Sequence, residues 1–179
     1  MYPYILLLRG INVGGHNKLS MAALKDLLAS MEMQKVQTYV QSGNTVFYSQ
    51  LEDANQIATL IQQQLDAVFG FQISVFCYPK EELQKIYSQN PFIKTKDLAQ
   101  LYVTFLSSPV ALSSHQSLVL PPDIEDECII QDRVIYVYCP NGYGRTKLNN
   151  NYFEKKLALN ATTRNWKTVQ NLHEMISEY

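Results

Sequence analysis

The chain has 179 residues, of which 46% are hydrophobic and 17% are charged, and its formal net charge is −1. This composition predicts a globular protein and excludes a disordered chain, because enough apolar surface is available to form a core. The low net charge also excludes a protein that is basic throughout, as a general nucleic-acid coat would be.

The sequence contains no segment that predicts export or membrane insertion. Its uninterrupted apolar runs are only a few residues long, whereas a bilayer span needs about 20. The N-terminus lacks the basic start and cleavage site of a signal peptide. The cysteines are odd in number and lack CxxC spacing, which is typical of a reducing compartment. We therefore expect a cytoplasmic protein with no membrane association, disulfide, metal or other cofactor.

The first 78 residues predict the order strand–helix–strand–strand–helix–strand. Apolar or β-branched runs predict strands over 5–9, 36–41, 45–49 and 72–78. Ser20 and Asp53 have the positions of helix N-caps, and Gly70 has that of a helix stop. Gly43-Asn44 is typical of a two-residue hairpin loop. This order is the split βαβ, or ferredoxin-like, motif.

The second half also mixes helices and strands. Its expected elements are a short helix after Pro79, a strand at 101–107, a turn-rich stretch at 109–126, a hairpin of 127–130 and 133–138, and helices at 149–158 and 164–178. We predict an α+β fold of two subdomains that share an interface. The N-terminal ferredoxin-like subdomain is expected at 1–78 and the C-terminal α+β subdomain at 79–179.

Charge is distributed unevenly along the chain. Residues 1–50 carry a net charge of +2, residues 51–140 carry −6, and residues 141–167 carry +5. A local anion site is therefore compatible with a chain that is nearly neutral as a whole. The alternative is that the basic residues pair with the acidic region 51–140.

Two glycine-rich stretches, 9–18 and 141–147, follow predicted strands and precede predicted helices. Glycines let successive backbone N–H groups converge on one point, so such loops suit phosphate or carboxylate groups. The alternative is that these glycines serve only tight turns. Arg164 and Lys167 are expected near the start of the last helix. The candidate anion-binding residues are thus Arg9, Asn12, His16, Lys18, Arg145, Lys147, Arg164 and Lys167.

Other chemistry-bearing residues favour structural roles, and no catalytic residue is assigned. Ser42 lies in a predicted hairpin turn and outside any nucleophile pattern. The histidines at 16, 115 and 173 lack the spacing of zinc ligands. The acidic run 123–127 is typical of a solvated turn, and Trp166 is expected in the core.

Four segments of the chain, in order, are similar to the signature of a bacterial family. They are LLRGINVGG at 7–15, TYVQSGNTVF at 38–47, NGYGRTKL at 141–148 and ATTRNWKTV at 161–169. The chain thereby resembles the "domain of unknown function 1697" family over essentially its whole length. The resemblance implies an α+β protein of two ferredoxin-like subdomains. It implies no particular activity, because the family carries no established reaction.

Three classes of function are compatible with these patterns. The leading hypothesis is a cytosolic protein that binds a phosphate-bearing ligand, either a nucleotide or a short nucleic acid, in a basic groove between the subdomains. The second is a small-molecule enzyme that acts on an anionic substrate. The third is a structural or protein-interaction module without a ligand. The sequence leaves open whether the protein is an enzyme and what its oligomeric state is.

Overall fold

The structure of the chain, a computed structural model, describes residues 1–111, 118, 120 and 124–179. The chain divides into two compact units. The first unit comprises Met1–Tyr87 and Asn171–Tyr179, and the second comprises Ser88–Gln170. The first unit therefore extends past the boundary expected after residue 78 and includes residues from the end of the chain.

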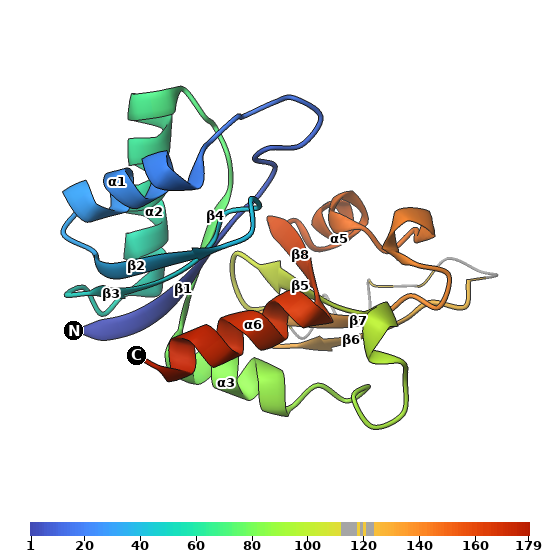
Figure 1. Cartoon of the computed structure of the whole chain (residues 1–179). Helices are drawn as coiled ribbons and strands as arrows, with labels where there is room; N and C mark the ends of the chain where they lie inside the picture. Colours follow the sequence, from blue (N-terminus) through green and yellow to red (C-terminus); the bar gives the residue numbers. More distant parts are fainter. Residues whose placement is uncertain (112–117, 119, 121–123) are drawn as a thin grey trace. The chain divides into compact units, whose positions relative to one another are not determined.

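The first unit contains the βαββαβ order that the sequence predicts. Its elements are β1 (Tyr2–Leu8), α1 (Met21–Ser30), β2 (Gln34–Tyr39), β3 (Asn44–Ser49), α2 (Ala54–Phe69) and β4 (Val75–Pro79), followed by α3 (Lys80–Ser88). The strands form one antiparallel sheet in the order β2-β3-β1-β4. Helices α1 and α2 lie over the same face of this sheet (Figure 1).

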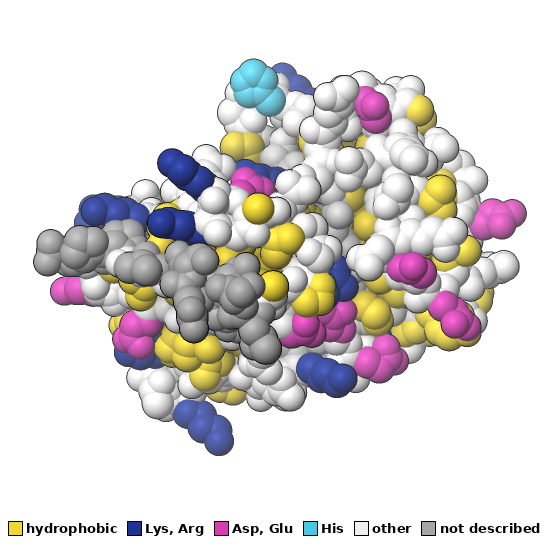
Figure 2. All heavy atoms as spheres, turned by 180° about the vertical axis from the view of Figure 1, so that it is seen from behind, with side chains coloured by type: hydrophobic (Ala, Val, Ile, Leu, Met, Phe, Trp, Pro, Cys, Tyr) yellow, Lys and Arg dark blue, Asp and Glu magenta, His cyan; other side chains and the backbone are white. Residues whose placement is uncertain are grey.

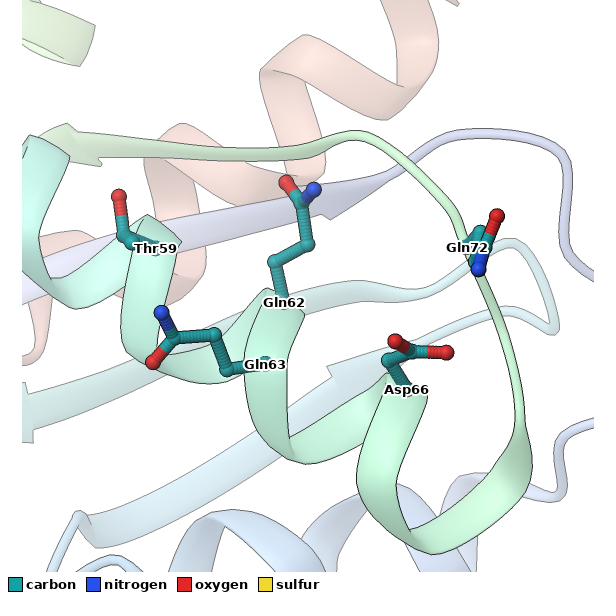
Figure 3. Close-up of a pocket in the computed structure, with 5 residues that line it drawn as sticks. All are labelled: Thr59, Gln62, Gln63, Asp66 and Gln72. Atoms are coloured by element: carbon teal, nitrogen blue, oxygen red, sulfur yellow. The ribbon is translucent and has the colours of Figure 1, made fainter.

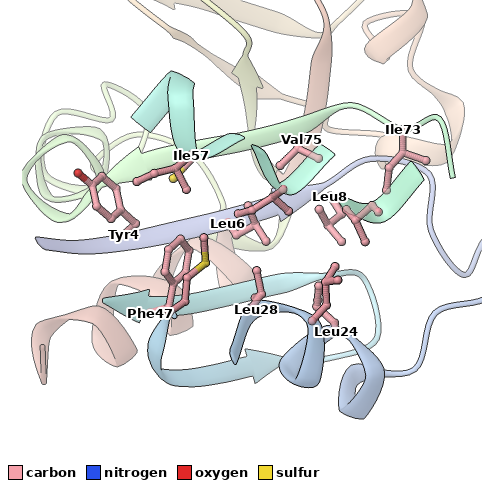
Figure 4. Close-up of a cluster of buried hydrophobic side chains, with 14 of the residues drawn as sticks. Tyr4, Leu6, Leu8, Leu24, Leu28, Phe47, Ile57, Ile73 and Val75 are labelled. Carbon is pink, nitrogen blue, oxygen red and sulfur yellow. The ribbon is translucent and has the colours of Figure 1, made fainter. Parts of the chain in front are cut away.

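The core of the first unit lies between this sheet and these two helices. Tyr4, Leu6 and Leu8 alternate along β1 and pack against apolar residues of the helices, including Leu28 and Ile57 (Figure 4). The intervening residues of β1 are also fully buried. This burial on both faces explains why β1 reads as a continuous apolar run rather than as an alternating one.

Local signals set the ends of the two helices. The Ser20 side chain accepts a hydrogen bond from the backbone N of Ala23 at 3.1 Å, which caps α1. Asp53 caps α2 in the same way, and Gly70 ends that helix in the left-handed conformation at φ 70°. The three predicted helix boundary residues are confirmed.

The hairpin between β2 and β3 differs from the sequence prediction. Asn44 belongs to β3 and pairs with Tyr39, so the loop contains the four residues 40–43 rather than the predicted Gly43-Asn44 pair. The Asn44 side chain explains the difference, because its Nδ2 donates to Tyr39 O at 3.2 Å and to Ser42 Oγ at 2.8 Å. These bonds span the loop and hold Asn44 in the strand.

The second unit repeats the strand order of the first. Its elements are η1 (Leu98–Gln100), β5 (Leu101–Leu106), β6 (Glu127–Gln131), β7 (Val134–Tyr138), η2 (Tyr143–Arg145), α5 (Asn150–Leu157), β8 (Ala161–Asn165) and the start of α6 (Trp166–Ser177). The antiparallel sheet has the order β6-β7-β5-β8, which matches the first sheet if β5 corresponds to β1. Most of the predicted turn-rich stretch 109–126, with His115 and Asp123, lies outside the described residues.

The end of the chain contains a strand that the sequence analysis missed. Residues 161–165 form β8, whereas a helix was predicted to begin at Arg164. Arg164 instead pairs with Val103 of β5, and the last helix begins at Trp166. The β-branched pair Thr162-Thr163 fits an extended conformation, and its pairing with β5 decides the outcome.

The last helix, α6, carries the predicted apolar face. Trp166 is buried, as predicted, with only 2% of its surface exposed. His173 is half-buried and stacks on Tyr87 of α3, with ring centroids 4.0 Å apart. No helix in the described part of the chain is long and apolar enough to cross a membrane.

Candidate functional site

The first glycine-rich loop, residues 9–19, is closed by the side chain of Asn12. Asn12 Oδ1 accepts from Leu19 N at 2.9 Å, and Nδ2 donates to Leu19 O and to Gln41 O, both at 2.8 Å. The amide therefore uses both of its hydrogens and one acceptor site within the protein. It joins this loop to the β2–β3 loop, and its positive φ of 54° fits the tight turn.

The backbone of this first loop is also engaged with itself. The N–H of Asn12 donates to Asn17 O, and the N–H of His16 donates to Val13 O. These groups are therefore not directed together at an external anion. The side chains of His16 and Lys18 are exposed. Anion binding by Arg9, Asn12, His16 and Lys18 stays a prediction.

The second glycine-rich loop follows β7 and is built from short-range backbone bonds. Gly142 N donates to Cys139 O at 3.0 Å, and Arg145 N donates to Gly142 O at 3.1 Å. The Tyr143 ring lies against Tyr102 of β5, with centroids 4.9 Å apart. This arrangement fixes the loop at the end of the second sheet.

A pocket of about 530 Å³ lies beside this second loop. Its lining residues, which we call the charged pocket, are Ile124, Glu125, Asp126, Asn141, Arg145 and Lys147. The structure thus brings together two of the predicted basic residues, Arg145 and Lys147, both of which are exposed. It adds two carboxylates and an amide that the sequence analysis did not assign to a site.

The carboxylates of the charged pocket are held by neutral donors. Asn141 Nδ2 donates to Glu125 Oε2 at 2.9 Å, and Thr146 Oγ1 donates to Asp126 Oδ2 at 2.6 Å. Glu127, the next residue, forms an ion pair with Lys96. Glu125 and Glu127 are nevertheless exposed, so the described part of the acidic run 123–127 is both solvated and anchored to its surroundings.

The two basic side chains of the pocket, Arg145 and Lys147, are not paired with its carboxylates. Within the described part of the chain, neither Arg145 nor Lys147 forms an ion pair, although Glu125 and Asp126 line the same pocket. Two positive charges are therefore presented to solvent near each other. An anionic group in the pocket would lower their mutual repulsion.

Thr146 connects the pocket to Cys139, the residue that directly follows β7. Besides donating to Asp126, its Oγ1 accepts from Leu148 N at 2.9 Å. It also forms a side-chain hydrogen bond with Cys139, which opposes the effect of burial on that thiol. Burial prevails and raises the pKa of Cys139 to about 11, so the thiol is protonated at neutral pH and is a poor nucleophile.

Arg164 and Lys167 do not line the charged pocket. Arg164 is buried in β8, where its Nη1 donates to Thr162 Oγ1 at 2.8 Å and to Thr163 O at 2.9 Å. Burial lowers the pKa of Arg164 to about 10, and Tyr143 partly offsets this effect. Lys167 is exposed in the first turn of α6. Ligand binding by either residue stays a prediction.

A second pocket, of about 420 Å³, lies in the first unit along α2. Its lining residues are Thr59, Gln62, Gln63, Asp66 and Gln72, and Figure 3 shows that all but Gln72 come from the helix. Among these described lining residues none is basic, and only Asp66 has a carboxylate. This pocket is therefore chemically unsuited to a phosphate group.

Figure 2 shows one face of the molecule, on which Lys and Arg side chains, some of them near one another, occur together with acidic and uncharged side chains.

The missing pocket residues had a signal in the sequence. In the β6–β7 hairpin, Glu127 pairs with Tyr138, so the residues just before β6 lie beside those just after β7. This register brings Glu125 and Asp126 to the loop that carries Arg145. The predicted hairpin of 127–130 and 133–138 is a signal for this proximity, because the outer ends of two paired strands lie side by side.

Comparison with known proteins supports the fold and the family. The model of a family described as "Protein of unknown function (DUF1697)" matches residues 1–136, about three quarters of the chain. A solved structure described as that of conserved bacterial protein SP0830 from Streptococcus pneumoniae is 24% identical, covers 98% of both chains and has a TM-score of 0.73, which supports a common fold. No curated protein matches the chain. The chain therefore belongs to the DUF1697 family.

Proposed function

We propose that the protein binds a small phosphate-bearing ligand in the charged pocket. The observation that carries the proposal is the pair Arg145 and Lys147, which line one pocket without an ion pair to any other described residue. Guanidinium and ammonium groups are the side chains that bind phosphate most strongly, through charge-assisted hydrogen bonds. The pocket volume of about 530 Å³ lies within the range of small-ligand sites.

A small ligand is favoured over a nucleic-acid chain. Glu125 and Asp126 line the same pocket and would repel a run of phosphates that extended past the two cations. A compact ligand with one anionic end avoids this repulsion.

The test is calorimetric titration of the whole chain with inorganic phosphate and with adenosine 5′-monophosphate. We expect saturable binding by the parent protein. The double variant Arg145→Gln/Lys147→Gln should bind at least tenfold more weakly, because a hydrogen bond to a charged group contributes about 1.5–3 kcal/mol.

The chain offers a matched control in the same unit. Lys155 and Lys156 are exposed on α5 and do not line the pocket, so Lys155→Gln/Lys156→Gln removes the same charge elsewhere. This control should bind like the parent. Equal weakening of both double variants would assign the effect to net charge and overturn the proposal, as would a parent protein that binds neither ligand.

A further inference from the structure

We propose that the ligand of the charged pocket is a ribonucleotide, whose ribose hydroxyls donate hydrogen bonds to Glu125 and Asp126 while its phosphate binds Arg145 and Lys147. This inference rests on the proposed function and adds the substrate class. It starts from the arrangement of opposite charges around one pocket.

The charges in the pocket are kept apart. Opposite charges around a shared space ordinarily lower their energy by pairing. Here the two carboxylates are bound by the neutral residues Asn141 and Thr146, which belong to the same loop as the two cations. The pocket thus offers a cationic part and a separate part made of hydrogen-bond acceptors.

Each carboxylate keeps acceptor capacity for a ligand. An ionised carboxylate has two oxygens with about four acceptor sites. The bonds from Asn141 and Thr146 use Oε2 of Glu125 and Oδ2 of Asp126, and they also orient the two groups. A purely anionic ligand would make no use of these acceptors, and their negative charge would weaken its binding to Arg145 and Lys147. A ligand with a phosphate at one end and hydroxyl donors at the other matches both parts.

Vicinal hydroxyls of ribose are the donors that fit best. Carboxylates recognise ribose hydroxyls in dinucleotide-binding proteins, where an acidic residue accepts from the 2′-OH. Among the described lining residues, Ile124 has an apolar side chain, which is half-buried and offers a surface for the face of a base. A phosphorylated amine would satisfy the same acceptors, and the experiment separates it from a ribonucleotide.

The experiment compares four probes on the parent protein by calorimetry: adenosine 5′-monophosphate, its 2′-deoxy analogue, inorganic phosphate and O-phosphoserine. We expect the ribonucleotide to bind at least tenfold more tightly than the deoxynucleotide. In Glu125→Gln and Asp126→Asn this preference should shrink to less than threefold. Binding of inorganic phosphate should be unchanged or tighter in both variants, because each loses a repelling charge. A role confined to folding would lower the melting temperature and leave the preference intact.

The outcomes distinguish this inference from the proposed function. If inorganic phosphate binds and the two nucleotides bind equally, the ribonucleotide assignment is overturned while the phosphate site stands. Tighter binding of O-phosphoserine than of either nucleotide also overturns it. If no probe binds, both proposals fail. The comparison of the two nucleotides uses only the parent protein, so it remains decisive if a variant does not fold.

Discussion

Gly43, the last residue of the β2–β3 loop, combines two constraints that a single substitution can test. Its φ of +72° lies in the left-handed region that disfavours residues with a Cβ. An added Cβ would also lie 2.8 Å from Leu8 Cβ and 2.8 Å from Ile11 Cδ1. Both neighbours are core residues that are at most 2% exposed, so neither can move into open space.

The two constraints give separable costs for Gly43→Ala. A left-handed conformation costs an alanine about 1–2 kcal/mol, and overpacking a filled core costs about 1–3 kcal/mol. We therefore expect a total loss of about 2–5 kcal/mol in the free energy of unfolding. Gly70→Ala is the matched control, because its φ is +70° but no atom lies within 4 Å of the added Cβ. The control should lose only the first part, about 1–2 kcal/mol.

Urea denaturation followed by circular dichroism measures both losses at 25 °C. The reasoning requires Gly43→Ala to lose at least 1 kcal/mol more than Gly70→Ala, which is about the lower limit for overpacking. Equal losses would refute the close packing of the β2–β3 loop against β1. They would leave only the left-handed backbone as the reason for glycine at residue 43.

Four further predictions concern hydrogen-bonding side chains and pH. Thr45→Val should raise the free energy of unfolding by about 1 kcal/mol, because Thr45 Oγ1 is buried with no hydrogen-bond partner among the described residues. Thr104→Val should lower the free energy of unfolding by about 1 kcal/mol, because it removes a hydrogen bond: Thr163 donates its proton to Asn150 Oδ1, so Thr104 must donate to Thr163. Denaturation midpoints that shift in opposite directions for the two threonine variants would confirm both predictions. Asn12→Ala should lower the melting temperature and leave binding of inorganic phosphate unchanged, measured by thermal shift and calorimetry, because its amide ties together two loops. Burial lowers the pKa of His173 below its ordinary 6.5, so the folded state favours the neutral ring and stability falls as the pH drops below that value. Between pH 7.5 and 5.5, the variant His173→Phe should therefore lose less stability than the parent protein.

The fold of the first unit was predictable because its signals are local. Capping by Ser20 and Asp53 and termination by Gly70 depend on a few adjacent residues. The apolar run of β1 has the composition of a strand buried on both faces. Such features can be predicted from the sequence, because the residues that determine each element lie within it or directly beside it.

The features that sequence reasoning missed depend on distant pairing. Strand β8 exists because it pairs with β5, which lies some sixty positions earlier in the chain. Its residues include Arg164, which was expected near the start of the last helix as a candidate anion-binding residue, whereas the side chain is buried and bonded to Thr162. The hairpin loop at 40–43 was misassigned because asparagine is common in turns, so Asn44 was placed in the loop rather than in the strand. Its hydrogen bonds within the loop override that preference.

Only part of the candidate site was predictable, because some of its residues reach the pocket through pairing between distant strands. Arg145 and Lys147 were identified from charge and glycine content within one loop. Glu125 and Asp126 reach the pocket only through the register of the β6–β7 hairpin. The sequence pattern of one loop therefore identifies the cations Arg145 and Lys147 but misses the acceptors Glu125 and Asp126. Both pairs of side chains determine which ligand fits the pocket.

The correspondence between the two sheets argues for one binding site per chain. If β5 corresponds to β1, the counterpart of the first glycine-rich loop is the connection after β5, and the counterpart of the second is the short connection 50–53 after β3. The two loops are therefore not repeats of one design, and only the second lines the charged pocket. We expect calorimetric titration with adenosine 5′-monophosphate to give one equivalent per chain, and His16→Gln/Lys18→Gln to leave that value and the affinity unchanged. Two equivalents in the parent, reduced to one by the His16 and Lys18 substitutions, would show that the first loop binds anions independently and that its internally bonded backbone does not prevent it.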